Sequence, residues 1–286
     1  MKHLRVLMIA AVTGMMLLLE ACSSAETKDA SPKEYDLEKP ERFAMPESLL
    51  EISGISFDKG NNDTIYAIQD EEGKLFRLAW GNKKQSHVKF GKSGDYEDVS
   101  IVRDRVVILK SNGSLFAFPF SDAIYDEIDS VQEWQRILPE GEYEGMFGDE
   151  ASGRLYILCK NCKADNNDNV TGYIYQVGDD SLVAAGQFNV DVESIKPFSG
   201  KVKKGFRPSA LAKNPVTNEW FMVSAINKLL VVADENWKVK NAYPLNGNTF
   251  NQPEGLAFDK AGNMYISNEG DDLSAGNILK FARLKP

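Results

Sequence analysis

Three glutamates in the same sequence context are the residues best able to do chemistry. Glu97, Glu144 and Glu254 each stand one residue before a small or acidic residue and a short apolar run. Ser53 and Ser209 occupy the same place in two further copies. The copies recur at roughly 40–50 residues, with one longer interval, which is typical of β-propeller blades. Because each copy starts an innermost strand, the repeat predicts that these side chains meet at one tunnel mouth.

Carboxylates held together in a partly dry funnel repel one another and need a cation, a basic partner or a proton. Calcium suits such a place, since it takes roughly 6–8 oxygen ligands in flexible geometry. The predicted calcium ligands are Glu97, Glu144, Glu254 and Asn268, with Asp70 and Asp98 behind them. The other polar residues expected at the mouth are Lys110, Lys160, Arg207, Ser209 and Glu269. The alternative is structural: the glutamates accept backbone N–H groups or pair with these basic residues.

The elements that must position this mouth are short strands separated by polar turns, which predicts an all-β chain folded as a single propeller. We count five blades, and six is the alternative if the insert Asp191–Phe206 hides a degenerate blade. Blade five, from Pro253 to Leu284, shows only three strands. The segment Tyr35–Phe43, which precedes blade one, is expected to supply the fourth strand of blade five, because ring closure removes exposed sheet edges.

The N-terminus is expected to be an export signal outside the fold. A basic head precedes the apolar run Val6–Leu19, which is too short to span a bilayer comfortably. The following Leu-Glu-Ala-Cys is similar to a bacterial lipobox, with Cys22 as the lipidated residue; a plain secretory signal is the alternative. We predict a signal peptide over 1–21, a flexible tether over 22–34 and the propeller over 35–286. The expected location is the Gram-negative-type envelope, on the outer membrane.

Composition narrows the classes of partner. The formal net charge of −9 and the absence of a basic stripe argue against nucleic acid. Cys159 and Cys162 form one C-x2-C pair, with no second pair or histidine cluster to complete a zinc site. In an oxidising, exported setting we favour a disulfide between them, with two free thiols as the alternative.

Six pieces of sequence are similar to the SdiA-regulated (YjiK/CarP-like) family of bacterial β-propeller lipoproteins. They begin at Glu51, Tyr96, Tyr143, Leu155, Arg207 and Pro253, and read EISGI, YEDV, YEG, LYILCK, RPSAL and PEGL. The resemblance implies an exported, often membrane-attached propeller with a link to calcium, rather than an established catalytic activity.

The function predicted from these features is a lipid-anchored binding or scaffold module with a calcium site at the tunnel mouth. Its ligand would be a protein or a small molecule. The sequence has no G-x-S-x-G or H-E-x-x-H motif and no histidine dyad. A metal-dependent hydrolase of the lactonase or phosphoesterase type, using the same funnel, is the alternative.

Overall fold

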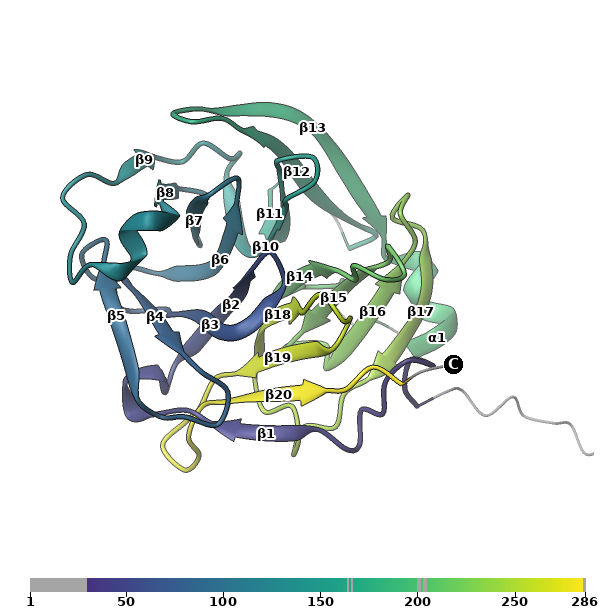
Figure 1. Cartoon of the computed structure of the whole chain (residues 1–286). Helices are drawn as coiled ribbons and strands as arrows, with labels where there is room; N and C mark the ends of the chain where they lie inside the picture. The colour runs from purple at the N-terminus through teal and green to yellow at the C-terminus, as the bar shows by residue number, and fades with distance from the viewer. Residues whose placement is uncertain (1–29, 164, 166, 200–201, 203–204, 285–286) are drawn as a thin grey trace, which may run out of the picture.

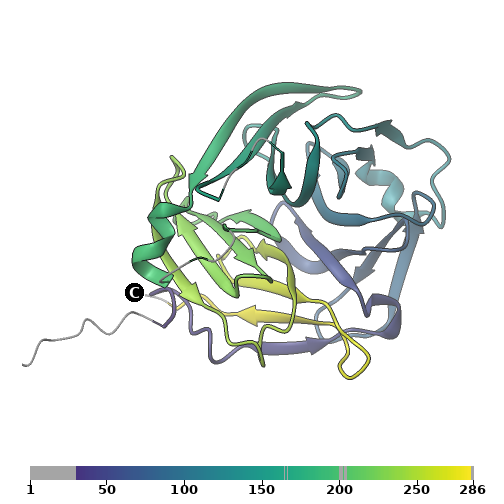
Figure 2. The same ribbon diagram turned by 180° about the vertical axis from the view of Figure 1, so that it is seen from behind.

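The computed structural model describes residues 30–163, 165, 167–199, 202 and 205–284. These residues form five four-stranded antiparallel sheets arranged in a ring (Figures 1 and 2). The prediction of an all-β, five-bladed propeller is therefore confirmed. The predicted signal peptide, Cys22 and most of the tether lie outside the described residues. No helix in the described part of the chain is long and apolar enough to cross a membrane.

Each blade runs outward from the tunnel. Blade 1 contains β2 (Ile52–Asp58), β3 (Asn61–Gln69), β4 (Lys74–Leu78) and β5 (Gln85–Lys89). Blade 2 contains β6 (Tyr96–Val102), β7 (Arg105–Lys110), β8 (Leu115–Pro119) and β9 (Gln132–Trp134), with the 3₁₀ helix η2 (Phe120–Ile124) before β9. Blade 3 contains β10 (Gly141–Asp149), β11 (Arg154–Cys162), β12 (Asn169–Val177) and β13 (Leu182–Asp191). Blade 4 contains β14 (Ala210–Lys213), β15 (Trp220–Ser224), β16 (Leu229–Ala233) and β17 (Val239–Pro244). Blade 5 contains β18 (Pro253–Phe258), β19 (Met264–Asn268), β20 (Asn277–Phe281) and β1 (Glu41–Ala44).

The hydrophobic core is divided among the gaps between neighbouring blades. Strands such as β15 and β16 are buried along their whole length, because each of their two faces is covered by an adjacent sheet. One cluster joins blades 4 and 5 through Phe221 and Phe258, and another joins blades 5 and 1 through Tyr265 and Phe57. The ring is therefore held together from blade to blade, and the innermost strands keep fixed positions around the tunnel.

The N-terminal strand closes the ring, as predicted. β1 pairs antiparallel with β20, with Phe43 opposite Ile278. The closing strand is shorter than the predicted Tyr35–Phe43, because Tyr35 is buried against the end of the ring instead. Its hydroxyl donates a hydrogen bond to the Gly262 carbonyl (2.6 Å) and accepts one from the Asn214 amide (2.8 Å).

The long interval between blades 3 and 4 is filled without a sixth sheet in the described residues. After β13 the chain forms the 3₁₀ helix η3 (Glu193–Ile195) and the short helix α1 (Lys196–Ser199). Helix α1 lies beside β17 (Figure 1). These two helices therefore cover the outer edge of blade 4.

The glycine that follows two of the motif residues is explained by the close approach of innermost strands. A Cβ on Gly255 would lie 2.5 Å from the Ser53 carbonyl oxygen of blade 1. A Cβ on Gly145 would lie 3.1 Å from the backbone of Ala210 in blade 4. Glycine at this place lets adjacent blades approach, which narrows the ring around the mouth.

Candidate functional site

The three glutamates occupy equivalent irregularities in their sheets. In β6, Tyr96 pairs with Lys110 and Asp98 with Leu109, so Glu97 is an extra residue in the ladder. The same shift leaves Glu144 extra in β10 and Glu254 extra in β18. A β-bulge takes one residue out of the pairing and redirects its side chain. The repeated bulge therefore turns one carboxylate out of the pairing at the start of each of these three innermost strands.

One lysine lies among the three carboxylates. Lys160, in β11, forms an ion pair with Glu144, whose side chain is only 10% exposed. The positive charge of the same ammonium also attracts the carboxylates of Glu97 and Glu254 and thereby acts to lower the pKa of both groups. Blades 2, 3 and 5 thus direct their glutamates toward a single basic group.

Lys160 does not fully offset the cost of burying these carboxylates. Burial is the largest cause that raises the pKa of Glu97 to about 8, and the negative charges of Asp95 and Glu254 add to it. Burial also raises the pKa of Glu254, although Lys160 and a hydrogen bond from the Ser209 hydroxyl oppose the change. At neutral pH the folded protein therefore favours a proton, or another positive charge, at this mouth.

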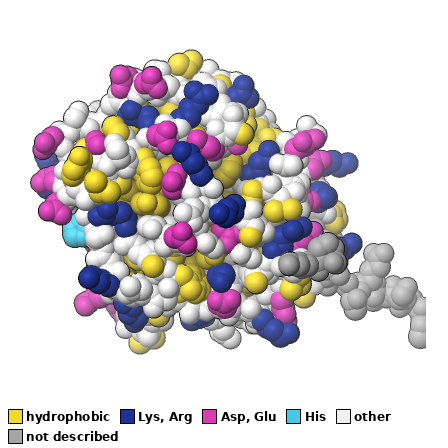
Figure 3. All heavy atoms as spheres, viewed as in Figure 1, with side chains coloured by type: hydrophobic (Ala, Val, Ile, Leu, Met, Phe, Trp, Pro, Cys, Tyr) yellow, Lys and Arg dark blue, Asp and Glu magenta, His cyan; other side chains and the backbone are white. Residues whose placement is uncertain are grey.

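The acidic region continues toward blade 1. Burial, followed by the nearby charges of Glu254 and Asp70, raises the pKa of Glu269 to about 7. Burial, followed by the charge of Glu51, raises the pKa of Asp70 to about 6. We use "acidic mouth" for the connected set Glu51, Asp70, Asp95, Glu97, Glu144, Glu254 and Glu269. Figure 3 shows acidic and basic side chains next to one another across one face of the ring.

The acidic mouth is wider than a preformed ion cage. Among the described residues, Cys159, Cys162 and Asp165 are the only group of three or more acidic, cysteine or histidine residues whose ligand atoms all lie within 4.8 Å of one another. Glu97, Glu144 and Glu254 converge electrostatically without meeting that spacing. A cation bound among them would therefore need water molecules or small side-chain movements to complete its coordination.

Two residues predicted as ligands have other roles in this structure. The oxygens of Asp98 accept the backbone N–H groups of Val99 (2.8 Å) and Met146 (2.7 Å), which ties blade 2 to blade 3. Asn268 is fully buried and donates its amide N–H to the Asn277 side chain (3.2 Å). Its own amide oxygen has no hydrogen-bond partner.

The basic residues predicted at the mouth separate into different surroundings. Lys110 lies over the ring of Tyr96, with its ammonium 5.0 Å from the ring centroid. Arg207 lines a neighbouring cleft of about 230 Å³ together with Lys160 and Asp165. Among the described residues, Lys160 is therefore the basic residue predicted for the mouth that pairs with a motif glutamate.

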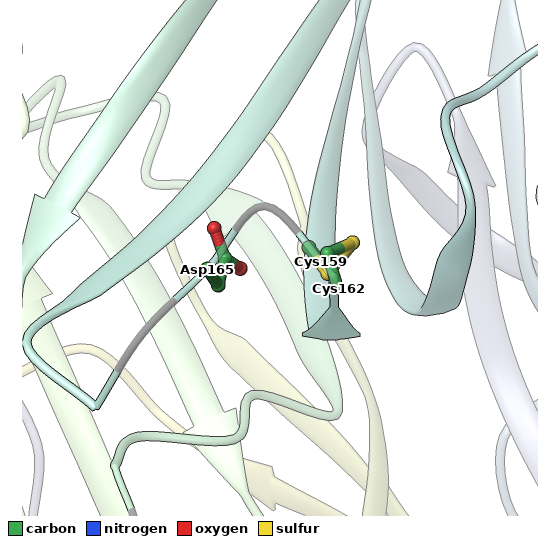
Figure 4. Close-up of side chains that lie close together, drawn as sticks. All are labelled: Cys159, Cys162 and Asp165. Atoms are coloured by element: carbon green, nitrogen blue, oxygen red, sulfur yellow. A yellow bond between two sulfur atoms is a disulfide. The ribbon is translucent and has the colours of Figure 1, made fainter.

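The cysteine group is a disulfide in this structure and not a metal centre. Cys159 and Cys162 are bonded to one another at the end of β11, with their Cα atoms 6.0 Å apart. Asp165 follows on the next loop, as Figure 4 shows. Its carboxylate accepts hydrogen bonds from the backbone and hydroxyl of Thr171. Both sulfurs and this carboxylate are thus already engaged.

Four charged or polar residues of the site were missed by sequence reasoning. Glu51 and Asp95 add negative charge, Lys228 adds an opposing positive charge, and the Gln252 amide hydrogen-bonds to Glu254 and Glu269. Asp95 and Gln252 each lie two residues before a motif glutamate. That fixed spacing is the signal that could have found them.

Comparison with known proteins supports the fold. Glutaminyl cyclase from Myxococcus xanthus matches with a TM-score of 0.56 and 12% identity, covering 86% of this chain and 96% of that chain. A calcium-binding protein, regucalcin from Agrobacterium tumefaciens, matches with a TM-score of 0.48 and 14% identity over 88% of this chain and 96% of that chain. At 12% identity the likeness to the glutaminyl cyclase concerns the fold alone. No curated protein sequence matches the chain.

A family model gives the more specific result. Residues 206–272, which hold β14 to β19, match the family described as SdiA-regulated. The matched segment includes the Arg207 and Pro253 pieces from which the resemblance was inferred. Together with the five-bladed ring, this match confirms that the chain resembles the SdiA-regulated β-propeller proteins.

Proposed function

We propose that this protein is an exported, lipid-anchored binding module whose acidic mouth takes up a calcium ion. The observation that carries the proposal is the imbalance of charge at the mouth. Several partly or fully buried carboxylates face a single ion-paired lysine there, and Lys228 adds only a weaker attraction to Glu254. A divalent cation would offset the mutual repulsion of Glu97 and Glu254, which raises the pKa of Glu97.

The donor atoms of the mouth fit calcium in kind. All of them are oxygens, which is the ligand type that calcium prefers. One oxygen of Glu144 and one of Asp70 are buried without a hydrogen-bond partner, so both remain free to accept a cation. Calcium also tolerates variable geometry and water ligands, which suits carboxylates that are more widely spaced than an ion cage.

Lys160 would act as an internal competitor for this cation. Its ammonium already neutralises Glu144 and attracts the other two glutamates. Bound calcium would repel that ammonium, so uptake would be coupled to movement of the lysine side chain. The affinity would therefore be lower than that of a site without a lysine.

The course of the described N-terminus supports an outward-facing mouth. Tyr35 is bound to Gly262 and Asn214, which lie in the turns after β18 and β14. Those turns are at the opposite end of the innermost strands from Glu254. If Cys22 carries a lipid, the tether would leave the ring on the side away from the acidic mouth. The mouth would then face away from the membrane and toward a ligand.

Thermal unfolding in chelator-treated buffer with added calcium tests the cation site. Calcium should raise the Tm of the wild type, since it binds the folded state preferentially. Glu254→Gln should reduce that rise, and Lys160→Met should increase it. Lys110→Met is the matched control, because Lys110 ends the equivalent strand of blade 2 but lies over an aromatic ring. A wild-type Tm that ignores calcium at millimolar levels, where even weak extracellular sites fill, would refute the proposal.

A further inference from the structure

A second opening of the tunnel lies on the other side of the ring. Its cavity has a volume of about 330 Å³ and is bounded by residues of all five innermost strands and by the turns that follow every one of these strands except β6. Ile55, Met146 and Leu256 lie at its inner end, and Lys59, Lys213 and Lys260 lie at its rim. The motif glutamates do not line this cavity. It is therefore separate from the acidic mouth.

The inner wall of this cavity is mainly apolar. Phe57, Ile101, Phe147 and Phe258 contribute to the lining, in addition to the aliphatic residues at the inner end. Phe147 is only partly buried, and its ring packs edge-on against Trp220 at 5.5 Å. Removing an apolar ligand from water into such a wall is favourable in proportion to the area buried.

The rim of the cavity carries three carboxylates, of Asp149, Glu150 and Asp259, beside its three lysines. Asp259 accepts hydrogen bonds from Asn62, Asn263 and the Tyr265 hydroxyl, and is fully buried. Glu150 accepts the backbone N–H of Arg103. Asp149 accepts hydrogen bonds from the Ser152 hydroxyl (2.6 Å) and the backbone N–H of Ala151 (3.3 Å). All three rim carboxylates therefore accept hydrogen bonds from within the protein.

Two lysines of the rim have no ion-pair partner in the part of the chain that is described. Lys213 lies 5.4 Å from the ring centroid of Trp220, and Lys260 forms no salt bridge, whereas Lys59 pairs with Asp104 at 2.8 Å. An anionic group at the rim would therefore meet two ammonium groups that form no ion pair within the described residues.

From this arrangement we propose that the cavity binds a small anionic amphiphile, with its apolar body inside the tunnel and its carboxylate at Lys213 and Lys260. Water occupies about 30 Å³ per molecule in the liquid, so the cavity holds a ligand of roughly a dozen non-hydrogen atoms. That is the lower end of the size range of small-molecule sites. A medium-chain fatty acid has this size and charge.

The test is isothermal titration of the full-length protein with decanoate, below its micelle concentration and with chelator present. Decylamine is the matched probe, because it has a similar tail and the opposite charge. We expect one decanoate per chain and at least tenfold weaker binding of decylamine. Lys213→Met combined with Lys260→Met should weaken decanoate binding at least fivefold. Lys163→Met, an exposed lysine outside this rim, should leave it unchanged.

A blocking variant locates the site. Ala151 is exposed and lines the cavity, so Ala151→Trp should obstruct the opening with little effect on folding, and it should abolish decanoate binding. Three results would each overturn the proposal: no binding of decanoate, equal binding of decanoate and decylamine, or binding that survives both Ala151→Trp and the double lysine variant. Because chelator is present throughout, the outcome is independent of the calcium site.

Discussion

Replacing Glu97 by glutamine should stabilise the protein, and the gain should depend on pH. Burial and the neighbouring charges of Asp95 and Glu254 raise the pKa of Glu97 from 4.5 to about 8. Below pH 4.5 the carboxyl group is protonated in both the folded and the unfolded chain, so wild type and Glu97→Gln should be similarly stable. Between pH 4.5 and 8 the unfolded chain loses this proton more readily than the folded chain. Wild-type stability should therefore fall across this window relative to the variant, and the difference should level off above pH 8.

The size of the effect follows from the same pKa. Each tenfold change in proton affinity corresponds to about 1.4 kcal/mol, so the full rise would destabilise the ionised protein by about 5 kcal/mol. Solvent screening reduces this figure because Glu97 is only partly buried. We therefore expect Glu97→Gln to gain about 2 kcal/mol at pH 8. For a chain of this length that gain corresponds to a rise in Tm of about 3–4 °C.

Urea unfolding at a series of pH values from 4 to 9, in chelator-treated buffer, measures this difference. Glu235→Gln is the control, since Glu235 is exposed in the turn between β16 and β17 and should show no such window. If calcium binds at the acidic mouth, saturating calcium should remove most of the advantage of Glu97→Gln. A stability difference that stays constant from pH 4 to pH 9 would refute the electrostatic account of this residue.

Three further outcomes test the anchor, the closure and the narrow ring. Cys22→Ser should move the protein from membranes to the soluble fraction, and failure of the wild type to incorporate labelled fatty acid would contradict the lipid anchor. Deleting from Cys22 through Lys33 should preserve the Tm, whereas deleting through Met45 should lower it sharply because β1 is lost; equal Tm values would argue against closure by β1. Gly255→Ala should cost about 1–3 kcal/mol by overpacking against blade 1, while Gly247→Ala, whose Cβ meets nothing within 4 Å, should be nearly neutral in urea unfolding.

The architecture was predictable because the same sequence pattern recurs in every blade. A period of 40–50 residues with strand patterning indicates a propeller even where single strands are ambiguous. The fourth strand of blade 5 could also be predicted, because the sequence of that blade shows only three strands and a segment near the N-terminus had no other role. The bounds of that strand were less accessible. Tyrosine is common in β-strands, so the sequence placed Tyr35 in the closing strand. Only its hydrogen bonds with Gly262 and Asn214 show that its side chain is instead a buried anchor.

The candidate site was only partly predictable, because sequence spacing does not reveal partners. The column of glutamates is visible in the sequence as a repeat feature, but the bulge that redirects Glu97, Glu144 and Glu254 depends on the register with the next strand. The acidic Asp98 follows Glu97 where Glu144 and Glu254 are followed by glycine. The Asp98 side chain accepts the backbone N–H of Met146 in blade 3 because the ring places the two strands side by side, which the sequence does not show.

The pairing of β1 with β20 sets an order of events in biosynthesis. Strand β1 must wait for β20, because Phe43 cannot meet Ile278 until the polypeptide through β20 has left the ribosome. Such distant pairing makes folding slow. For a chain exported as its N-terminus predicts, this delay is useful, since an open ring can be threaded through a translocation channel more easily than a closed one. The completed propeller would then form only on the far side of the membrane.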